Sequence, residues 1–473
     1  MRRKGLWCYL IFTFAVCILP LAGMPWKMSG ESGENRTLAE FPSIREEDGW
    51  NVDVLADAGA YFEDHFAWRQ ELVTADAVLR GKLLGVSAKE SVIAGTDGWL
   101  YYKDSLEDYQ GENVLSDRAI FNISHTLRMM QDYVERGGRK FIFTVAPNKN
   151  SLYNEHMPYY DNVIVSDIHN IDLLKEAMER EDVHYVDLFH VFESRDEVLY
   201  HQRDSHWNNM GASLAAQELL DALEKEHRLW QEESYEMRTD FEGDLDKMLY
   251  PGAVTLEDEF YFTEPFRYEY VGEVESNFDP EIRTVSSGKD GSLLMYRDSF
   301  GNALLPFMAE EFGSARFSRG IPYYLDDMIF CSADTVIVER SERFLPDMGK
   351  NPPVAQAPLV MLNTGDCELL GEDDANYATC ETSDEGLYLK FSGTVEKEQM
   401  QTDSQIYLRL DGEYVYEAFP VTVETEEGVS DYGYAACIEK EKLEGEEGKA
   451  ELFVTGAQGI RNVFQGTVTY MEQ

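Results

Sequence analysis

The apolar run Leu293-Leu294-Met295-Tyr296 leads into Arg297-Asp298-Ser299-Phe300-Gly301, and a helical pattern follows at residues 302–312. A short apolar run, a polar turn and an amphipathic helix together predict a strand-to-helix connection. Ser299 is therefore expected at the carboxyl edge of a sheet, where the amides of the helix's first turn face its hydroxyl. Asp and Ser are also the commonest helix N-caps, so this stretch alone equally favours a capping role.

Similar runs on both sides of this stretch predict the rest of the fold. Short β-rich runs at 141–145, 184–188, 293–296 and 335–338 alternate with helical patterns at 117–135, 168–180, 211–226 and 302–312. This alternation indicates an α/β fold in which a mostly parallel sheet is flanked by helices on both faces. With a further helical stretch from residue 52 to 84, it predicts one domain over residues 51–350.

The pattern changes after residue 352. Runs at 387–391, 405–410 and 450–454 alternate apolar and polar residues with period two, and turns rich in Gly and Asp separate them. We interpret residues 355–473 as a separate antiparallel β-sandwich domain. Its tyrosines have the flat rings that stack on sugars, although period-two spacing also suits packing within a sheet; they are Tyr388, Tyr407, Tyr414 and Tyr416.

The first residues have the pattern of a targeting segment. Arg2, Arg3 and Lys4 precede an uncharged, apolar stretch from residue 5 to 23. A basic flank followed by such a stretch predicts a signal peptide or signal anchor over residues 1–24, with the rest of the chain outside the cytoplasm. Residues 25–50 are polar and irregular and are expected to be a tether.

Length, charge and cysteines narrow the class of protein. A chain of 473 residues is long enough for an α/β core and an accessory module. Its net charge of -48 repels phosphate backbones, which argues against nucleic acid as a partner. The chain has no CxxC pair, which disfavours a zinc ribbon. Cys367 and Cys380 are able to form a disulfide in an oxidising compartment, and free buried thiols are the open alternative.

Asp204-Ser205-His206-Trp207 supplies what a serine nucleophile needs. A serine hydroxyl is a poor nucleophile near neutral pH and requires a base within hydrogen-bond reach, a role that suits His206. Asp204 is expected to project to the same side of an extended segment and to orient the imidazole. A capping acid beside a surface histidine is the alternative for an isolated Asp-x-His.

Two further sets of residues are candidates. Asn148, after the strand at 141–145, is able to donate to an oxyanion, although a turn residue after proline is the commoner role. Arg297 is a second candidate for an oxyanion or substrate contact. A metal site is disfavoured because the spacing lacks the one-face pattern of zinc motifs, so we expect neither metal nor cofactor; its ligands would be His190, His201, Asp204 and His206.

Five motifs in order resemble the alginate O-acetyltransferase group (AlgJ and AlgX type) and the related DHHW proteins of the SGNH hydrolase-like superfamily. The resemblance covers roughly residues 33–345, with Ser205 at the second position of the signature Asp-His-His-Trp. The motifs are Glu34-Asn35-Arg36-Thr37-Leu38-Ala39-Glu40-Phe41-Pro42, Phe62-Glu63-Asp64-His65-Phe66-Ala67-Trp68-Arg69, Gly95-Thr96-Asp97-Gly98-Trp99-Leu100-Tyr101, Asp204-Ser205-His206-Trp207-Asn208 and Arg297-Asp298-Ser299-Phe300.

The resemblance implies a serine acyl-enzyme mechanism. Ser299 would take an acetyl group and pass it to a hydroxyl of a cell-envelope or secreted polysaccharide, with His206 as base and Asp204 as its orienting acid. A membrane-bound O-acyltransferase would supply the acetyl group, and the tail would be a carbohydrate-binding module. Two alternatives stay open at this point: a carbohydrate esterase with the same triad, and a catalytically silent glycan-binding or assembly scaffold.

Overall fold

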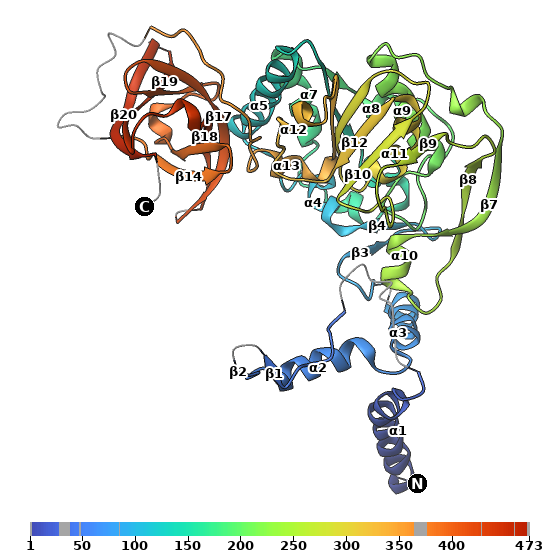
Figure 1. Ribbon diagram of the computed structural model, residues 1–473. Helices are drawn as coiled ribbons and strands as arrows, with labels where there is room; N and C mark the ends of the chain where they lie inside the picture. The colour runs from blue at the N-terminus through green and yellow to red at the C-terminus, as the bar shows by residue number, and fades with distance from the viewer. Residues whose placement is uncertain are drawn as a thin grey trace.

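Two seven-stranded sheets dominate the computed structural model (Figure 1). The structure describes residues 2–27, 38–46, 49–84, 86–363, 376–426, 428–457 and 459–470. Residues 34–37 of the first motif and Cys367 lie outside the described residues. Cys380, the predicted disulfide partner of Cys367, has the free-thiol form that the sequence analysis left as the alternative. Cys331, Cys380 and Cys437 are free thiols.

The central sheet has the strand order β6-β5-β13-β11-β12-β10-β9. Neighbouring strands are parallel from β6 to β12, whereas β10 is antiparallel to β12 and β9 is antiparallel to β10. The strands are β5 (Lys140–Ala146), β6 (Tyr185–Val186), β9 (Tyr268–Tyr270), β10 (Glu281–Ser286), β11 (Ser292–Tyr296), β12 (Ser314–Ser318) and β13 (Thr335–Ser341).

The mostly parallel sheet that the sequence predicts is therefore corrected to a mixed sheet. The predicted runs at 141–145, 293–296 and 335–338 fall within β5, β11 and β13, which are buried almost throughout, as parallel strands usually are. Residues of β10 instead alternate between exposed and buried, as in an antiparallel strand with one solvated face. A search for continuous apolar runs does not find such a strand.

Helices cover both faces of this sheet, as predicted. Leu293 and Met295 of β11 pack into one apolar cluster, and Leu294 and Tyr296 into the cluster on the opposite face. The first cluster includes α9 (Asn209–Ala222) and α11 (Gly301–Glu311). The second includes α5 (Asp117–Glu135), α7 (Asn170–Arg180), α12 (Asp327–Phe330) and α13 (Leu345–Met348). The short α8 (Leu188–Glu193) contributes side chains to both.

Short elements connect the layers near the carboxyl edge of the sheet. The predicted turn at 95–98 joins β3 (Val92–Ala94) to β4 (Leu100–Tyr102), and Asp97 and Gly98 have the positive φ angles of such a turn. A longer hairpin that the sequence analysis did not find pairs β7 (Tyr235–Glu242) with β8 (Leu256–Phe262). The helices here are α4 (Leu106–Tyr109), α6 (Lys149–Leu152) and α10 (Asp244–Leu249).

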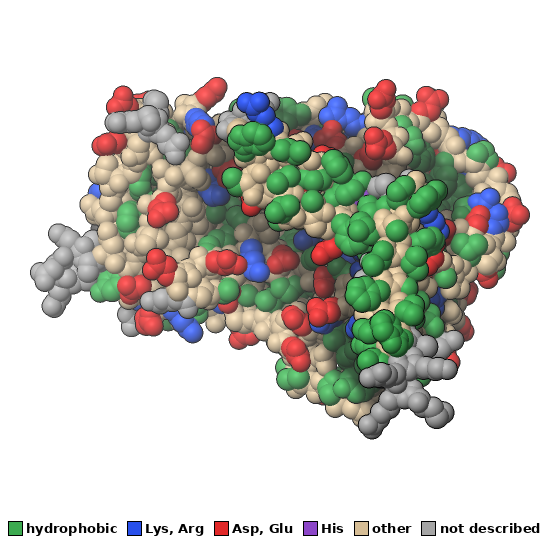
Figure 2. All heavy atoms as spheres, turned by 90° about the horizontal axis from the view of Figure 1, so that it is seen from below, with side chains coloured by type: hydrophobic (Ala, Val, Ile, Leu, Met, Phe, Trp, Pro, Cys, Tyr) green, Lys and Arg blue, Asp and Glu red, His purple; other side chains and the backbone are tan. Residues whose placement is uncertain are grey.

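The N-terminal part extends away from the central sheet (Figure 1). It comprises α1 (Arg2–Gly23), the pair β1 (Arg45–Glu46) and β2 (Gly49–Trp50), α2 (Val54–His65) and α3 (Arg69–Leu84). Figure 2, seen from below, shows apolar side chains gathered over this end, and Trp7, Phe12 and Ile18 of α1 are exposed. Among the described residues, no helix is long and apolar enough to cross a bilayer.

The C-terminal part is one antiparallel sheet rather than the predicted β-sandwich. Its order is β14-β15-β18-β17-β16-β19-β20, and it curls so that the segment before β14 reaches β20, where Tyr377 N donates to Val463 O at 2.9 Å. The strands are β14 (Glu381–Glu385), β15 (Tyr388–Thr394), β16 (Ile406–Leu410), β17 (Tyr414–Thr425), β18 (Gly428–Glu439), β19 (Glu447–Gly456) and β20 (Gly459–Thr469). Period-two alternation predicts a sheet with one buried face, and a single curled sheet covers that face by itself.

Most tyrosines considered for sugar stacking are part of the packing. Tyr388, Tyr407 and Tyr416 are buried, and the hydroxyl of Tyr388 donates to Asp326 of the central part of the chain. Tyr414 is exposed over 52% of its surface. Of the four rings, only Tyr414 is therefore available to a ligand in the described structure.

Helix α5 joins the two sheets. Arg118 is 2% exposed and donates to the backbone carbonyls of Thr402 and Ser404 at 3.1 and 2.6 Å. His125, about two helical turns further along α5, lies between Glu181 after α7 and Glu417 of β17, at 3.1 and 2.9 Å. Arg118 bonds to backbone carbonyls and His125 is paired with two acids, so the junction is held by specific hydrogen bonds.

Candidate active site

Ser299 lies in the turn between β11 and α11, as the sequence predicts. The turn is held by Asp298, whose carboxylate accepts hydrogen bonds from Phe300 N at 3.0 Å and from Ser341 N and Oγ at 2.8 and 2.6 Å. Gly301 is required by close packing, because a Cβ there would lie 2.6 Å from the Cβ of Arg297. Helix α11 has no side-chain cap, so neither Asp298 nor Ser299 is an N-cap.

A continuous hydrogen-bonded chain joins Ser299, His206 and Asp204. The Oγ of Ser299 is 2.8 Å from Nε2 of His206, and Nδ1 of His206 is 2.7 Å from Oδ1 of Asp204. The three residues come from segments 93 residues apart in the sequence. The three side chains thus lie within hydrogen-bond distance in the order that the sequence analysis expects, and their catalytic roles stay a prediction.

The loop that carries Asp204 and His206 is a turn rather than the expected extended segment. Oδ1 of Asp204 accepts the backbone N–H of His206 at 2.9 Å as well as its ring Nδ1. His201 N donates to His206 O at 3.2 Å, which closes the loop. The ring of Phe300 packs edge-on against His206, with centroids 4.8 Å apart, and Trp207 Nε1 donates to the Phe300 carbonyl at 3.2 Å.

Opposite charges shift the pKa values of the pair. Burial acts to lower the pKa of His206, but its hydrogen bond to Asp204 and the charges of Asp204 and Asp244 raise it above the ordinary value. Burial acts to raise the pKa of Asp204, but His206 holds it well below the usual carboxyl range. Asp204 is therefore ionised near neutral pH and stabilises a protonated imidazole, which is what a base acting on a hydroxyl requires.

Asp244 is a second acid at the site that the sequence analysis missed. Ser205 donates to its carboxylate through N at 2.8 Å and Oγ at 2.6 Å, and Asp244 N donates to Oδ2 of Asp204 at 2.7 Å. An oxygen of Asp244 lies 3.7 Å from Nδ1 of His206. Asp244 opens helix α10 with no local motif around it, so only the three-dimensional structure could have found it.

Asn148 is buried at the carboxyl end of β5. Its N–H donates to Glu342 at 2.7 Å, whereas both polar atoms of its side chain are buried without a hydrogen-bond partner. The alternative of an ordinary turn residue leaves these atoms unexplained, because a buried unpaired amide costs about 1–3 kcal/mol.

Arg297 has partners away from the triad. Its guanidinium donates to the side chain of Asn302 and, at 2.9 Å, to the backbone carbonyl of Asp279. Burial lowers its pKa to about 10. These bonds hold the turn around Ser299, and a direct role of Arg297 at an oxyanion stays a prediction.

The four residues that the sequence analysis names as alternative metal ligands do not lie together at one point. His201 hydrogen-bonds to Glu259 at 3.1 Å and stacks on Phe241, and His190 is exposed on α8. Within the described residues, potential ligand atoms come close together at Asp204, His206 and Asp244, whose polar atoms already bond to one another and to Ser205.

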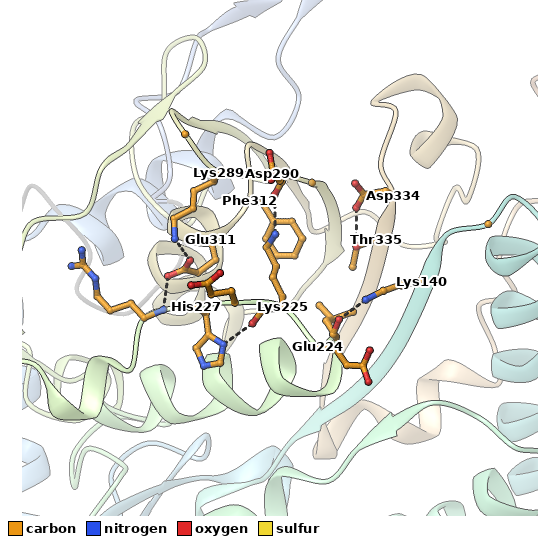
Figure 3. Close-up of a pocket in the computed structure, with 16 residues that line it drawn as sticks. Lys140, Glu224, Lys225, His227, Lys289, Asp290, Glu311, Phe312, Asp334 and Thr335 are labelled. Carbon is orange, nitrogen blue, oxygen red and sulfur yellow. Dashed lines mark hydrogen bonds and ion pairs between the residues drawn. The ribbon is translucent and has the colours of Figure 1, made fainter.

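A cavity of about 790 Å³ lies at the other edge of the central sheet (Figure 3). Lys140, Gly291 and Thr335, at the amino ends of β5, β11 and β13, line it. Lys225 extends over the ring of Phe312 there, 4.5 Å from its centroid, and donates to Asp290 O at 2.8 Å. The triad is at the carboxyl ends of the same strands, so this cavity is not part of the candidate active site.

Comparison with known proteins first defines a class. Residues 92–260 match the family model described as SGNH hydrolase-like domain, acetyltransferase AlgX. This span includes Asn148, Asp204 and His206 and ends before Ser299. The resemblance to the AlgJ and AlgX group that the motifs indicate is thereby confirmed.

Particular relatives are similar over part of the chain. The probable alginate O-acetylase AlgJ of Pseudomonas syringae pv. tomato is 25% identical over 194 residues, which are 40% of this chain and 47% of that protein. The chain thus spans about half the length of the curated relative it matches.

Three of the solved structures with distant similarity each cover 54% of this chain. A DHHW family protein from Eubacterium siraeum has a TM-score of 0.41 and 15% identity, over 54% of this chain and 94% of that one. Bacillus cereus PatB1 has a TM-score of 0.42 and 13% identity, over 54% of this chain and 96% of that one. The O-acetyltransferase domain of Pseudomonas putida AlgJ has a TM-score of 0.37 and 16% identity, over 54% of this chain and 92% of that one. TM-scores below 0.5 add no weight to the assignment.

Proposed function

We propose that this protein is an extracytoplasmic O-acetyltransferase that moves an acetyl group through Ser299 onto a hydroxyl of a cell-envelope or secreted polysaccharide. The observation that carries the proposal is the hydrogen-bonded chain from Ser299 Oγ through His206 to Asp204. The match of residues 92–260 to an acetyltransferase family supports acetyl as the transferred group. The basic and apolar N-terminal stretch supports export.

In the first half-reaction, Ser299 Oγ attacks the carbonyl carbon of an acetyl donor. His206 Nε2 accepts the hydroxyl proton as the new C–O bond forms, and Asp204 stabilises the resulting imidazolium. The tetrahedral intermediate then breaks its bond to the donor oxygen, which takes the proton from His206. The products are acetyl-Ser299 and the free donor alcohol.

In the second half-reaction, a sugar hydroxyl replaces the donor. His206 accepts the proton of the sugar hydroxyl while the sugar oxygen attacks the acetyl carbonyl carbon. The bond from that carbon to Ser299 Oγ then breaks, and Oγ takes the proton back from His206. The products are the acetylated sugar and the free serine. Water in place of the sugar would give hydrolysis, so transferase and esterase share every step but the acceptor.

Asn148 is the candidate donor to the oxyanion in both tetrahedral intermediates. Its buried side-chain amide has no other partner and lies on the strand end next to β13, whose Ser341 bonds to Asp298. A preorganised donor of this kind needs no reorganisation when the charge develops.

The proposed partners follow from the resemblance. A membrane-bound O-acyltransferase would present the acetyl donor, and a polysaccharide would accept it. The division into a catalytic part at 51–350 and an accessory module at 355–473 belongs to this proposal, with the junction through α5 as its support.

The test is turnover of a chromogenic acetyl ester by the purified chain, with and without oligosaccharide acceptors. Acetylated oligosaccharide in the product supports the transferase, and acetate release that no acceptor changes identifies an esterase. Ser299→Ala is expected to lower kcat by about a millionfold. Ser314→Ala, at the amino end of β12, is the matched control and is expected to leave kcat unchanged. Turnover by Ser299→Ala within tenfold of the wild type, or none by the wild type, contradicts the proposal.

A further inference from the structure

Lys149, the first residue of α6, is buried beside the triad, and it has no carboxylate partner among the described residues. Its side chain is 4% exposed and its ammonium donates to three backbone carbonyls: His201 at 3.0 Å, Gln202 at 2.9 Å and Asp204 at 2.5 Å. Burying an ammonium is costly unless its charge is compensated, so a residue of this kind needs an explanation.

The three bonds use every donor that an ammonium has. Lys149 therefore has no N–H left for a substrate or an intermediate. Carbonyls of nearly consecutive residues normally point in different directions along a chain. They converge here because the loop from His201 to Asp204 wraps around one nitrogen atom. The ammonium thus determines the path of the loop that carries the acid of the triad.

Two rings of the Gly95-to-Tyr101 motif complete the surroundings of Lys149. The centroids of Trp99 and Tyr101 are 5.5 and 5.1 Å from its nitrogen, and both rings are almost completely buried. Cation–π attraction is strongest when the cation is desolvated, as here. Leu100 N also donates to Gln202 O at 2.9 Å, so strand β4 holds the same loop from its backbone. The motif thus has a physical role that does not involve substrate.

Burial and surrounding charges act on Lys149 in opposite directions. Desolvation lowers its pKa to about 8, while three acids counter that effect and one base adds to it. The charged groups that face it are Asp204, Asp244, Glu257 and Arg203. The Lys149 ammonium that holds the loop therefore begins to lose its proton at mildly alkaline pH.

We propose that Lys149 is a positioning residue: by binding the carbonyls of His201, Gln202 and Asp204 within the Trp99–Tyr101 pair, it holds the Asp204 carboxylate against Nδ1 of His206. The inference rests on the proposed function for its kinetic consequence only. The geometry that it explains, the 2.7 Å contact between Asp204 and His206, is measurable without turnover.

The principal variant is Lys149→Met, which keeps the length of the side chain and removes the charge and donors. We expect kcat for the acetyl ester to fall about 100-fold, with KM within about twofold, because a small displacement of a catalytic group has effects of this size. Lys225→Met is the matched control. It too removes an ammonium that lies over an aromatic ring and bonds to a carbonyl, but at the opposite edge of the sheet.

The distinguishing measurement is the far-downfield proton resonance of His206 Nδ1, recorded by NMR on the full chain. A lysine with only a structural role would leave this resonance unchanged. Wild type and Lys225→Met are expected to show it, and Lys149→Met to lose or shift it. The wild-type rate is also expected to fall above about pH 8, as Lys149 loses its proton. If Lys149→Met does not fold, Trp99→Leu is measured in the same way, with a smaller effect in the same direction.

Three outcomes overturn the inference: an unchanged resonance in the folded variant, a kcat within threefold of wild type, or a rise in KM alone, which would make Lys149 a substrate contact. Absence of acetyl-ester turnover in the wild type contradicts the proposed function instead. The resonance then still decides whether Lys149 positions the Asp204–His206 pair.

Discussion

His206 at the candidate active site and His125 at the junction of the two sheets each bond to a carboxylate through Nδ1. His206 has Asp204 at Nδ1 and the hydroxyl of Ser299 at Nε2. His125 has Glu181 at Nδ1 and Glu417 at Nε2. In both, carboxylates raise the pKa of the ring against the effect of burial, for His125 to about 9.

The difference lies in what the second ring nitrogen meets. With a carboxylate on each side, His125 is a permanent imidazolium near neutral pH and acts as a structural cation between α5, the end of α7 and β17. With a carboxylate on one side and a hydroxyl on the other, His206 is able to accept a proton and return it. An acid–histidine pair by itself therefore does not identify a catalytic base; its remaining partner does.

The largest expected effect of this comparison concerns the acid bonded to Nδ1 of each histidine. These acids are Asp204 at His206 and Glu181 at His125. Asp204→Asn is expected to lower kcat about 10⁴-fold, because an amide neither stabilises the imidazolium nor selects the correct tautomer. Glu181→Gln, the equivalent change at His125, is expected to leave kcat unchanged. Acetyl-ester kinetics of both variants check this, and a comparable loss in both would break the contrast between catalytic and structural histidine.

A smaller effect is expected on stability, in the opposite order. His125→Leu leaves Glu181 and Glu417 as unpaired acids at the junction, which is expected to cost about 3 kcal/mol of unfolding free energy. His190→Leu, on an exposed position of α8, is the control. Urea unfolding of both variants is the measurement. If the two are equally stable, the His125 bridge does not stabilise the junction.

The smallest effects are opposite pH trends. The pKa of His125 is raised from about 6.5 to about 9, so its stabilising contribution is complete below pH 6.5 and is lost as pH rises through 9, by up to about 1.4 kcal/mol per pH unit. His206 must be unprotonated to act as base, so kcat/KM is expected to rise with pH, with a midpoint above 6.5, until the fall above about pH 8 that loss of the Lys149 proton predicts.

Unfolding free energies and rates measured between pH 6 and 10 check both trends. In His125→Leu the alkaline loss of stability should disappear while the rise in kcat/KM stays. A stability profile that is the same in wild type and His125→Leu would assign the alkaline loss to other groups.

Local signals in the sequence predicted the parts of the site that depend on one turn. The run before Ser299 and the Asp-x-His spacing are contained in a few residues, and strands whose carboxyl ends share one edge bring them together. Asp244 and Lys149 act across 39 and 55 residues on the same loop. No periodicity records such contacts, and a lysine after a strand normally indicates a surface residue.

The sheets show a similar limit. Continuous apolar runs predicted β5, β11 and β13, but β9, β10 and β12 were missed, and with the antiparallel β9 and β10 the mixed character of the sheet. In the C-terminal part, alternation predicted strands correctly and their arrangement wrongly. One buried face looks the same in sequence whether a second sheet covers it or the sheet curls over it.

The curl of the C-terminal sheet has a consequence for association with other chains. Unpaired strand edges are templates for association with other chains. Here the two outermost strands meet, since Thr382 of β14 donates to Thr469 O of β20 at 3.0 Å and Gln465 N of β20 bonds to Asn376 at 3.0 Å. These bonds cover part of each outer edge, so that β14 and β20 are poorer templates for strands of other chains.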